Sequence, residues 1–425
     1  MLSIDVVKEN PEAVKETIKN KFQGDKLELV DKAIEIDKKW RELKKQEDDL
    51  RAERNKVSKK IAELKKKGEN AEEEMKRAKE IPDKISELHK KQEETLEERN
   101  LILQKLPNFM SERTPVGKDD SENVTEEYFG EKPEFDFEVK PHSQIAEELG
   151  MADFESAAEV SGSGFYYLEG DLALLNQALI QYAIDKMTSK GYRYVETPLM
   201  LRNDVINRET DLTQQEEMIY RISDEELSLI GTSEHSLIGR HFDKELNQKK
   251  LPIKQTSYSM CFRKEIGSHG LDEKGLFRTH QFNKVEMAVI CLPEDSDKIF
   301  EEMKEITLEI FKDLELPRRV LKICSGDLGD LKKEQVDIEV YSPRQDDYIE
   351  LGSCSNLTDA QARKLGISTR VKNERLTPHT LNNTAVATSR ALVAILENHQ
   401  QKDGSVRIPS VLQPYMKGKT KLDAD

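Results

Sequence analysis

The sequence has few cysteines and no long apolar run. Its four cysteines lie far apart among 425 residues and include no CxxC pair, so neither a disulfide framework nor a structural zinc site is expected. The longest apolar stretches, such as 391–396, are far too short to cross a bilayer, and the N-terminus has no apolar signal-peptide core. These absences predict a cytoplasmic protein that does not bind zinc or membranes.

The chain also lacks the common nucleotide-binding signatures. Neither GxGxxG nor GxxxxGK(S/T) occurs, so neither a Rossmann nor a P-loop site is indicated. No convincing Ser-His-Asp or Cys-His set is present. The net charge of −16 argues against binding of RNA over the whole surface, although local charge matters more than the total.

The length exceeds what one hydrophobic core usually supports, so two domains are expected. Residues 28–106 carry apolar residues at alternating steps of four and three, the heptad pattern of a coiled coil. The first seam consists of Ile36, Trp40, Leu43, Leu50, Val57, Ile61 and Leu64, with Glu47 and Arg54 at its two polar positions; the second consists of Met75, Ala78, Ile85, Leu88, Leu96, Leu103 and Leu106. A turn near 67–70 predicts an antiparallel hairpin arm about 60 Å long. Pro82 predicts a kink or a break in the second helix.

The half of the first helix near the turn is basic. Residues 51–67 hold eight basic and two acidic side chains, a net charge of +6. One interpretation is a solvated helix face, and the other is a surface that contacts phosphates; composition does not choose between them. The candidate contacts are Arg51, Arg54, Lys56, Lys59 and Lys60.

Residues 108–140 are rich in Pro, Gly, Asp, Glu and Ser and are predicted to be a linker. The preceding domain would span 1–107 and a larger one 141–425. In the larger domain helical patterns and short strand-like runs are mixed without strict βαβ alternation. This favours an α+β fold with an antiparallel sheet and flanking helices.

Several stretches of this larger domain concentrate polar residues where strands are expected. Two strands joined by a long loop over 266–277 would place Arg263 on one face of the first, and Phe282, Lys284 and Glu286 on one face of the second. The guanidinium of Arg263 suits a phosphate or a carboxylate, although an ordinary cross-strand Arg–Glu pair is the alternative.

Two further stretches concern anions and metals. Arg390 stands in the first turns of a predicted helix, where a cation is unfavourable to the helix dipole; it either answers an anion or lies in solvent. Glu350 and Ser353 offer a carboxylate and a hydroxyl three residues apart, oxygen ligands that suit Mg²⁺ beside phosphates.

In their order, these features resemble motifs 2 and 3 of the class II aminoacyl-tRNA synthetases, and residues 190–199 with the preceding helix resemble motif 1. The closer resemblance is to the seryl-tRNA synthetases and covers nearly the whole chain, including the N-terminal hairpin. It rests on 114–119, 160–168, 231–234, 280–282, 353–356, 397–400 and 408–416. The fold implied is a class II antiparallel sheet with flanking helices behind a coiled-coil arm.

The resemblance implies an AMP-forming ligase that activates L-serine with ATP and Mg²⁺ and transfers it to tRNA(Ser), with tRNA(Sec) a candidate second substrate. It implies that Arg263 and Arg390 are catalytic, with Arg263 on the serine carboxylate and the α-phosphate and Arg390 on the γ-phosphate. Other implied serine contacts are Thr232, Ser233, Glu234, Glu286, Asn382 and Thr384. Other implied ATP contacts are Lys264, Glu265, Thr279, Phe282, Glu350, Leu351, Gly352 and Ser353, with Glu350 and Ser353 holding Mg²⁺.

The resemblance also implies a homodimer, with Pro198 of motif 1 at its interface, and tRNA contacts by the basic half of the arm. One departure concerns motif 3, which is commonly richer in glycine than Asn383, Thr384 and Ala385 are here. Two rivals to this reading are a homologue that loads another carrier and a structural coiled-coil protein with a degenerate globular domain.

Overall fold

The computed structural model describes residues 2–210, 218–265 and 275–424. The chain divides into two compact units, Met1–Pro107 and Asn108–Asp425. Within the described ranges, no helix is both long enough and apolar enough to span a membrane. Most of the predicted long loop, residues 266–274, lies outside the described residues.

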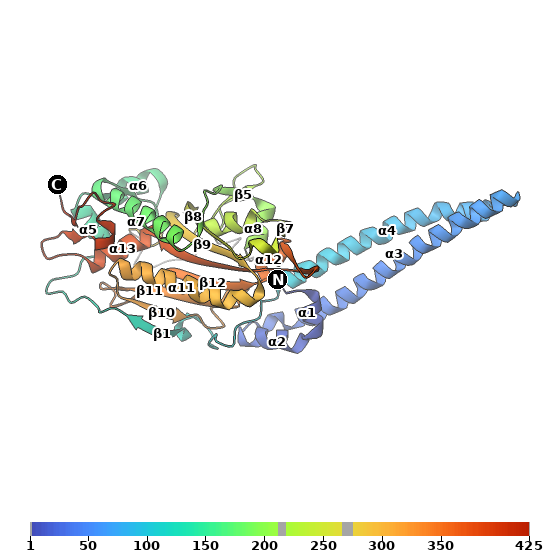
Figure 1. Cartoon of the computed structure of the whole chain (residues 1–425), viewed down its shortest axis with the longest axis horizontal. Helices are drawn as coiled ribbons and strands as arrows, with labels where there is room; N and C mark the ends of the chain where they lie inside the picture. Colours follow the sequence, from blue (N-terminus) through green and yellow to red (C-terminus); the bar gives the residue numbers. More distant parts are fainter. Residues whose placement is uncertain (1, 211–217, 266–274, 425) are drawn as a thin grey trace. The chain divides into compact units, whose positions relative to one another are not determined.

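The N-terminal unit is helical. Its elements are α1 (Ile4–Glu9), α2 (Pro11–Asn20), a 3₁₀ turn (Gly24–Lys26), α3 (Leu27–Lys67) and α4 (Glu72–Lys105). The two long helices α3 and α4 lie side by side and run antiparallel (Figure 1). Gly68 ends α3 in the left-handed conformation, with φ 69°, which a glycine adopts without a steric penalty. The predicted coiled-coil arm is confirmed.

The interface between α3 and α4 follows the predicted seam with corrections. Val57 is buried as expected, but Arg54, which was assigned to a seam position, is exposed. In α4, Met75 is exposed, and the buried stripe includes Ile81, which the predicted seam left out between Ala78 and Ile85. α4 continues through Pro82, so no break occurs there, because packing along the seam holds the helix together around one missing hydrogen bond.

Two carboxylates are buried in this unit. Glu47, at a predicted seam position, is hydrogen-bonded by side chains of both long helices. Asp37 accepts hydrogen bonds at 2.6–2.9 Å from three cationic side chains, Lys8, Arg41 and Arg99. Burial alone would raise the pKa of Asp37, but these bonds outweigh it and lower the pKa to about 2.

The second unit is built on an eight-stranded sheet, as the predicted α+β class requires. Its strands, in spatial order, are β1 (Val124–Phe129), β10 (Arg318–Lys322), β11 (Glu334–Ser342), β12 (Asp347–Thr358), β15 (His379–Ala387), β9 (Gln281–Cys291), β8 (Ile253–Phe262) and β4 (Arg193–Tyr194). All neighbours pair antiparallel except β4 and β8. The predicted antiparallel sheet is confirmed.

Long helices cover one face of this sheet (Figure 1). They are α7 (Gly170–Ser189), α11 (Ser296–Asp313) and α13 (Thr388–Asn398). Successive residues of a strand point to opposite faces, so Val285 and Met287 of β9 join the core under these helices, while Lys284 and Glu286 point to the other face. On that second face stand three short helices, α8 (Asn203–Glu209), α10 (Ser233–Gly239) and α12 (Ala360–Lys364).

Small elements complete the unit. They are α5 (His142–Glu148), β2 (Ala152–Asp153), α6 (Phe154–Ser161), β3 (Tyr167–Leu168), β5 (Met200–Arg202), β6 (Leu227–Leu229), β7 (Glu245–Leu246), β13 (Ser368–Val371), β14 (Glu374–Leu376), β16 (Val406–Arg407) and β17 (Lys421–Leu422).

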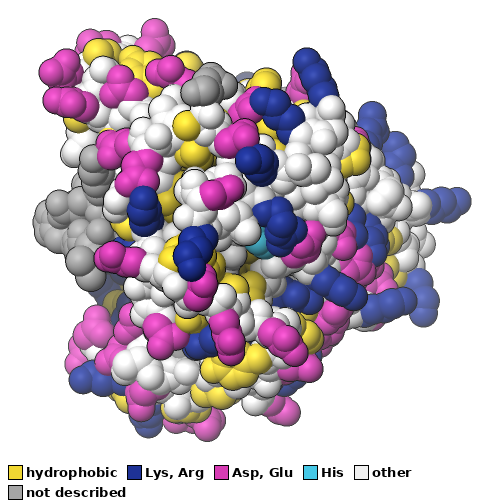
Figure 2. All heavy atoms as spheres, turned by 90° about the vertical axis from the view of Figure 1, so that its left-hand side faces the viewer, with side chains coloured by type: hydrophobic (Ala, Val, Ile, Leu, Met, Phe, Trp, Pro, Cys, Tyr) yellow, Lys and Arg dark blue, Asp and Glu magenta, His cyan; other side chains and the backbone are white. Residues whose placement is uncertain are grey.

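On the face drawn in Figure 2, acidic and basic side chains are intermingled and hydrophobic ones lie in small groups between them.

The segment expected to be a linker, 108–140, contributes to this unit. Its residues 124–129 form β1, which pairs with β10 at the edge of the sheet. The side-chain amide of Asn108 donates to the backbone oxygens of Leu331 and Leu357 at 3.1 and 3.0 Å. A composition rich in Pro, Gly and acids predicts few regular elements, but an edge strand needs hydrogen-bond partners on one side only.

Candidate functional site

Polar side chains line two adjoining cavities on the face of the sheet opposite the long helices. The larger has a volume of about 260 Å³ and the smaller about 80 Å³. Four residues line both cavities: Arg263, Lys284, Glu350 and Thr384. Because Lys284, Glu350 and Thr384 come from the adjacent strands β9, β12 and β15, the sheet itself fixes their spacing.

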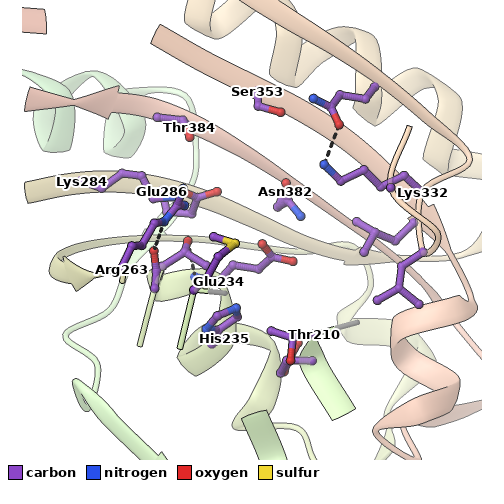
Figure 3. Close-up of a pocket in the computed structure, with 18 of the residues that line it drawn as sticks. Thr210, Glu234, His235, Arg263, Lys284, Glu286, Lys332, Ser353, Asn382 and Thr384 are labelled. Atoms are coloured by element: carbon purple, nitrogen blue, oxygen red, sulfur yellow. Dashed lines mark hydrogen bonds and ion pairs between the residues drawn. The ribbon is translucent and has the colours of Figure 1, made fainter. Parts of the chain in front are cut away.

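The larger cavity places acidic and basic side chains opposite each other (Figure 3). Arg263, directly after β8, is held by a hydrogen bond from its Nε to the oxygen of Gly231 at 3.2 Å, and its guanidinium lies 5.2 Å from the centre of the Phe282 ring. The Nζ of Lys284 is 2.5 Å from Oε2 of Glu286, and both side chains are buried. The predicted alternative, an ordinary cross-strand Arg–Glu pair, is not what fixes Arg263.

Two groups in this cavity titrate far from their usual range. Burial and the nearby carboxylate of Glu234 raise the pKa of Glu286 to about 7, although Lys284 and Arg263 oppose the shift. Burial, together with the cations Lys284 and Arg263, lowers the pKa of His235 to about 3. His235 is therefore neutral, and Glu286 is poised to change its charge near pH 7.

The start of α10 supplies one wall of the larger cavity. Thr232 caps the helix, and its Oγ1 accepts a hydrogen bond from the backbone N–H of Glu234 at 3.3 Å. Both residues line the cavity. Ser233 does not, because its hydroxyl donates to the oxygen of Ser257 at 3.4 Å, toward the sheet.

Strand β12 reaches the cavities through a bulge. Ile338 of β11 pairs with Gly352, but the next residue of β11 pairs with Glu350, so Leu351 is an extra residue in the ladder. Glu350 and Ser353 therefore both line the larger cavity, while Leu351 lines the smaller one and packs into the core under the helices. Gly352 faces α11 instead, where a Cβ atom would lie 3.1 Å from a methyl group of Thr307.

Strand β15 shows how the predicted motif 3 departure is accommodated. Asn382 and Thr384 line the larger cavity. Asn383 points to the opposite face, where its amide donates to the oxygen of Met303 at 2.8 Å and to the hydroxyl of Thr307 at 2.9 Å. Of Asn383, Thr384 and Ala385, the three residues that depart from motif 3, only Thr384 lines the larger cavity and so affects its shape.

The smaller cavity combines aromatic rings with cations. Phe282 and Phe277 line it together with Arg390, whose guanidinium lies 4.9 Å from the centre of the Phe277 ring. Arg390 Nη1 donates to the backbone oxygen of Glu350 at 2.9 Å and to its carboxylate at 3.1 Å. Arg390 therefore forms an ion pair with a carboxylate inside the site and is not a solvent-exposed arginine.

The oxygen donors around Glu350 fit a hard cation. Arg390 lowers the pKa of Glu350 against the effect of burial, whereas burial and the Glu350 carboxylate raise the pKa of Asp337, which stands opposite Ser353 on β11, to about 8. Carboxylate and hydroxyl oxygens are ligands that Mg²⁺ prefers. The described residues hold no cluster of three or more His, Cys, Asp or Glu side chains suited to a metal. Mg²⁺ usually keeps several waters and binds through one or two carboxylates together with substrate phosphates.

The structure brings most of the predicted site residues together. Those that line at least one cavity are Thr232, Glu234, Arg263, Glu265, Thr279, Phe282, Glu286, Glu350, Leu351, Ser353, Asn382, Thr384 and Arg390. Ser233, Lys264 and Gly352 line neither. The predicted tRNA contacts Arg51, Arg54, Lys56, Lys59 and Lys60 are all exposed on α3, and Lys60 forms an ion pair with Glu74 at 2.5 Å.

Other residues of the site were given no role in the prediction. Lys284 was expected on the same strand face as Phe282 and Glu286 but was not assigned a substrate contact. Glu209, which lines the larger cavity, carries no local signal, since it reaches the cavity only because α8 packs against distant segments. Asp337 lines neither cavity but pairs with Ser353, which does. Arg278, which forms an ion pair with Glu265 at 3.6 Å, also lines the smaller cavity.

Comparison with known proteins identifies the relatives of this chain. Residues 1–110 match the model of the seryl-tRNA synthetase N-terminal domain, and residues 218–399 match that of the tRNA synthetase class II core domain (G, H, P, S and T). A serine–tRNA ligase of Methanospirillum hungatei is 44% identical, covering 99% of both chains, and one of Pyrococcus furiosus is 43% identical, covering 98% of this chain and 96% of its own.

Solved structures agree. The crystal structure of seryl-tRNA synthetase from Pyrococcus horikoshii complexed with ATP is 40% identical, with a TM-score of 0.94 and full coverage of both chains. The cytoplasmic serine–tRNA ligase of Naegleria fowleri in complex with AMP is 31% identical, with a TM-score of 0.90, and the match covers 100% of this chain and 99% of that one. With its heptad arm, its antiparallel sheet and its paired cavities, this chain belongs to the seryl-tRNA synthetase family of class II aminoacyl-tRNA synthetases.

Proposed function

We propose that this chain activates L-serine with ATP to form seryl-adenylate and pyrophosphate, and then transfers the seryl group to a terminal ribose hydroxyl of tRNA(Ser). The observation that carries the proposal is that Arg263 and Arg390, distant in sequence, line one small cavity beside a larger one that contains carboxylates. Both substrates are anionic where they react, so the site must supply positive charge and orientation more than acid–base chemistry.

The larger cavity is assigned to serine. Glu234, with the backbone held by Thr232, would accept the ammonium group, and Arg263 would bind the carboxylate. Glu286 and Thr384 would hydrogen-bond the hydroxyl, with Asn382 beside them. A pocket built to bond a hydroxyl rejects alanine, because its buried polar groups are then left without partners.

The smaller cavity is assigned to ATP. The ring of Phe282 would stack on the adenine base, with Glu265 and Thr279 nearby, and Arg390 would bind the γ-phosphate. Arg263 lines both cavities, so it would join the serine carboxylate to the α-phosphate at the point of attack. Glu350 and Ser353 would hold Mg²⁺, which neutralises phosphate charge when bound.

The arm is assigned to the tRNA. Recognition of an RNA helix by shape and backbone needs exposed cations on a rigid support more than aromatic side chains. Residues 51–67 of α3 supply such cations. Reversing the charge of Lys56 and Lys59 should weaken tRNA charging about tenfold or more and leave adenylate formation unchanged. Reversal at the exposed Lys38 and Lys39, on the same helix far from the turn, is the matched control.

A homodimer is the assembly we assign, from the motif 1 resemblance around Pro198. Apolar side chains exposed on the segments that precede motif 1 in the chain support it, because an interface would cover them: Val160 is 72% exposed, Tyr167 47% and Leu174 54%. Analytical ultracentrifugation should give twice the chain mass, and Leu174→Glu should shift the protein toward the monomer. A monomer at micromolar concentration would contradict this assignment.

The deciding experiment is serine-dependent ATP–pyrophosphate exchange, run in parallel with threonine, alanine and cysteine, followed by charging of tRNA(Ser) and of tRNA(Sec). Exchange with serine and charging of tRNA(Ser) are expected, as for a cytoplasmic enzyme of translation. Exchange without charging of any tRNA would favour a homologue that loads another carrier. No exchange with any amino acid would favour a structural coiled-coil protein.

A further inference from the structure

A buried amide joins two carboxyl groups behind the larger cavity. Nε2 of Gln361, on α12, donates to Oε2 of Glu209 at the end of α8 and to Oε1 of Glu234 on α10, each at 2.8 Å. Gln361 is 1% exposed and Glu209 is 4% exposed. Three short helices that are separate in sequence are thus tied together through one side chain. Glu234 and Glu209 also line the cavity, whereas Gln361 stands behind them.

The environment of Glu209 is costly for a carboxyl group. Burial and the neighbouring Glu234 raise the pKa of Glu209 well above its usual value, although Lys364 and Gln361 oppose the shift. Oε1 of Glu209 has no hydrogen-bond partner within the described ranges. It faces Gly239, where a Cβ atom would lie 3.2 Å away. A buried carboxyl with one unsatisfied oxygen does not stabilise a fold, so its placement calls for another explanation.

We propose that Gln361, anchored by Glu209, is a positioning residue that holds the carboxylate of Glu234 in the orientation that receives the serine ammonium group. This inference rests on the proposed role of Glu234. Gln361 occupies Oε1 of Glu234 and leaves Oε2 for the ligand. Within the described part of the chain Glu234 has no ion-pair partner, so its charge stays available.

The chemistry of the bridge explains why an amide stands at this position. A lysine or arginine at 361 would neutralise Glu234 and compete with the substrate ammonium. An apolar side chain would leave the carboxylate free to rotate, and the orientation of a binding group must be fixed closely for it to contribute fully. A glutamine donates both amide hydrogens without bringing charge. Glu209 supplies the second acceptor that keeps the amide from turning away.

The test is a substrate-resolved measurement on the full chain. Gln361→Met keeps the length of the side chain and removes both hydrogen bonds, so in ATP–pyrophosphate exchange the KM for serine should rise about tenfold or more while the KM for ATP is little changed. Gln400→Met is the matched control, since Gln400 is also buried and hydrogen-bonded but lines neither cavity. If Gln361→Met does not fold, Gln361→Asn carries the same expectation, because its shorter amide cannot reach both carboxyl groups.

A second pair of variants tests the anchor. Glu209→Gln keeps an acceptor oxygen for Gln361, and Glu209→Leu does not, so the KM for serine should be much higher in the leucine variant. Glu234→Gln separates the two levels of the proposal. No rise in the serine KM of Glu234→Gln would refute the assignment of Glu234 itself. A rise there with none in Gln361→Met, or an equal rise in the serine and ATP KM of Gln361→Met, would overturn the bridge alone.

Discussion

Removal of the Arg263 side chain should lower kcat/KM for both serine and ATP, whereas removal of the Arg390 side chain should lower it for ATP alone. Arg263 lines both cavities and Arg390 lines only the smaller. In the proposed complex Arg263 makes at least two charge-assisted hydrogen bonds, one to the serine carboxylate and one to the α-phosphate. At about 1.5–3 kcal/mol each, their loss amounts to about 3–6 kcal/mol, or roughly 10²–10⁴ in kcat/KM.

The assay is ATP–pyrophosphate exchange with each substrate varied in turn. Arg263→Ala should lower kcat/KM for serine and for ATP alike, and Arg390→Ala should act on ATP with the serine KM little changed. Arg263→Lys keeps the charge but loses the planar fork of donors, so its activity should lie between that of Arg263→Ala and that of the unaltered enzyme. Thermal unfolding of each variant checks that the fold is intact. A folded Arg263→Ala protein that loses less than about tenfold, or that loses activity toward ATP alone, would refute the placement of Arg263 between the two substrates.

Three further outcomes follow from particular side chains. The pKa of Glu286 is about 7, and an ionised carboxylate accepts a stronger hydrogen bond than a protonated one. The KM for serine should therefore fall as the pH rises from 6 to 8, and Glu286→Gln should abolish this pH dependence. A flat profile in the unaltered enzyme would contradict the assignment of Glu286. The pKa of Asp37 is lowered from its ordinary value of 3.8 to about 2 in the folded protein. The ionised carboxylate therefore contributes about 2 kcal/mol of stability above pH 4, and this contribution is lost as the pH falls toward 2. Circular dichroism should show that the arm of Asp37→Asn is less stable at pH 7 and less sensitive to acid. Gly352→Ala should lower the thermal unfolding temperature, because the new methyl group would meet Thr307 at 3.1 Å and overpacking costs about 1–3 kcal/mol, whereas Gly24→Ala, with open space around it, should not.

The sequence by itself determined the features that depend on short, regular spacings. The heptad steps between 36 and 106 predict two antiparallel helices, since a repeat near 3.5 residues keeps one stripe of each helix toward a partner. The spacing of two among Phe282, Lys284 and Glu286 predicts a single polar face on one strand, and all three line the cavities. The resemblance of the ordered motifs likewise needs no coordinates.

Tertiary structure alone decided which of those residues meet. The bulge at Leu351 brings Glu350 and Ser353 to the same side of the sheet, and a regular strand would have separated them, so a spacing of three gave no reason to expect it. In the arm, the apolar residues alone did not fix every seam position: Met75 is exposed, whereas Ile81, which the predicted seam left out, is buried. The Glu209–Gln361–Glu234 bridge joins residues up to 152 positions apart, and Asp337 meets Ser353 only because β11 pairs with β12. No local pattern encodes such contacts, because they arise only when separate helices and strands pack against one another.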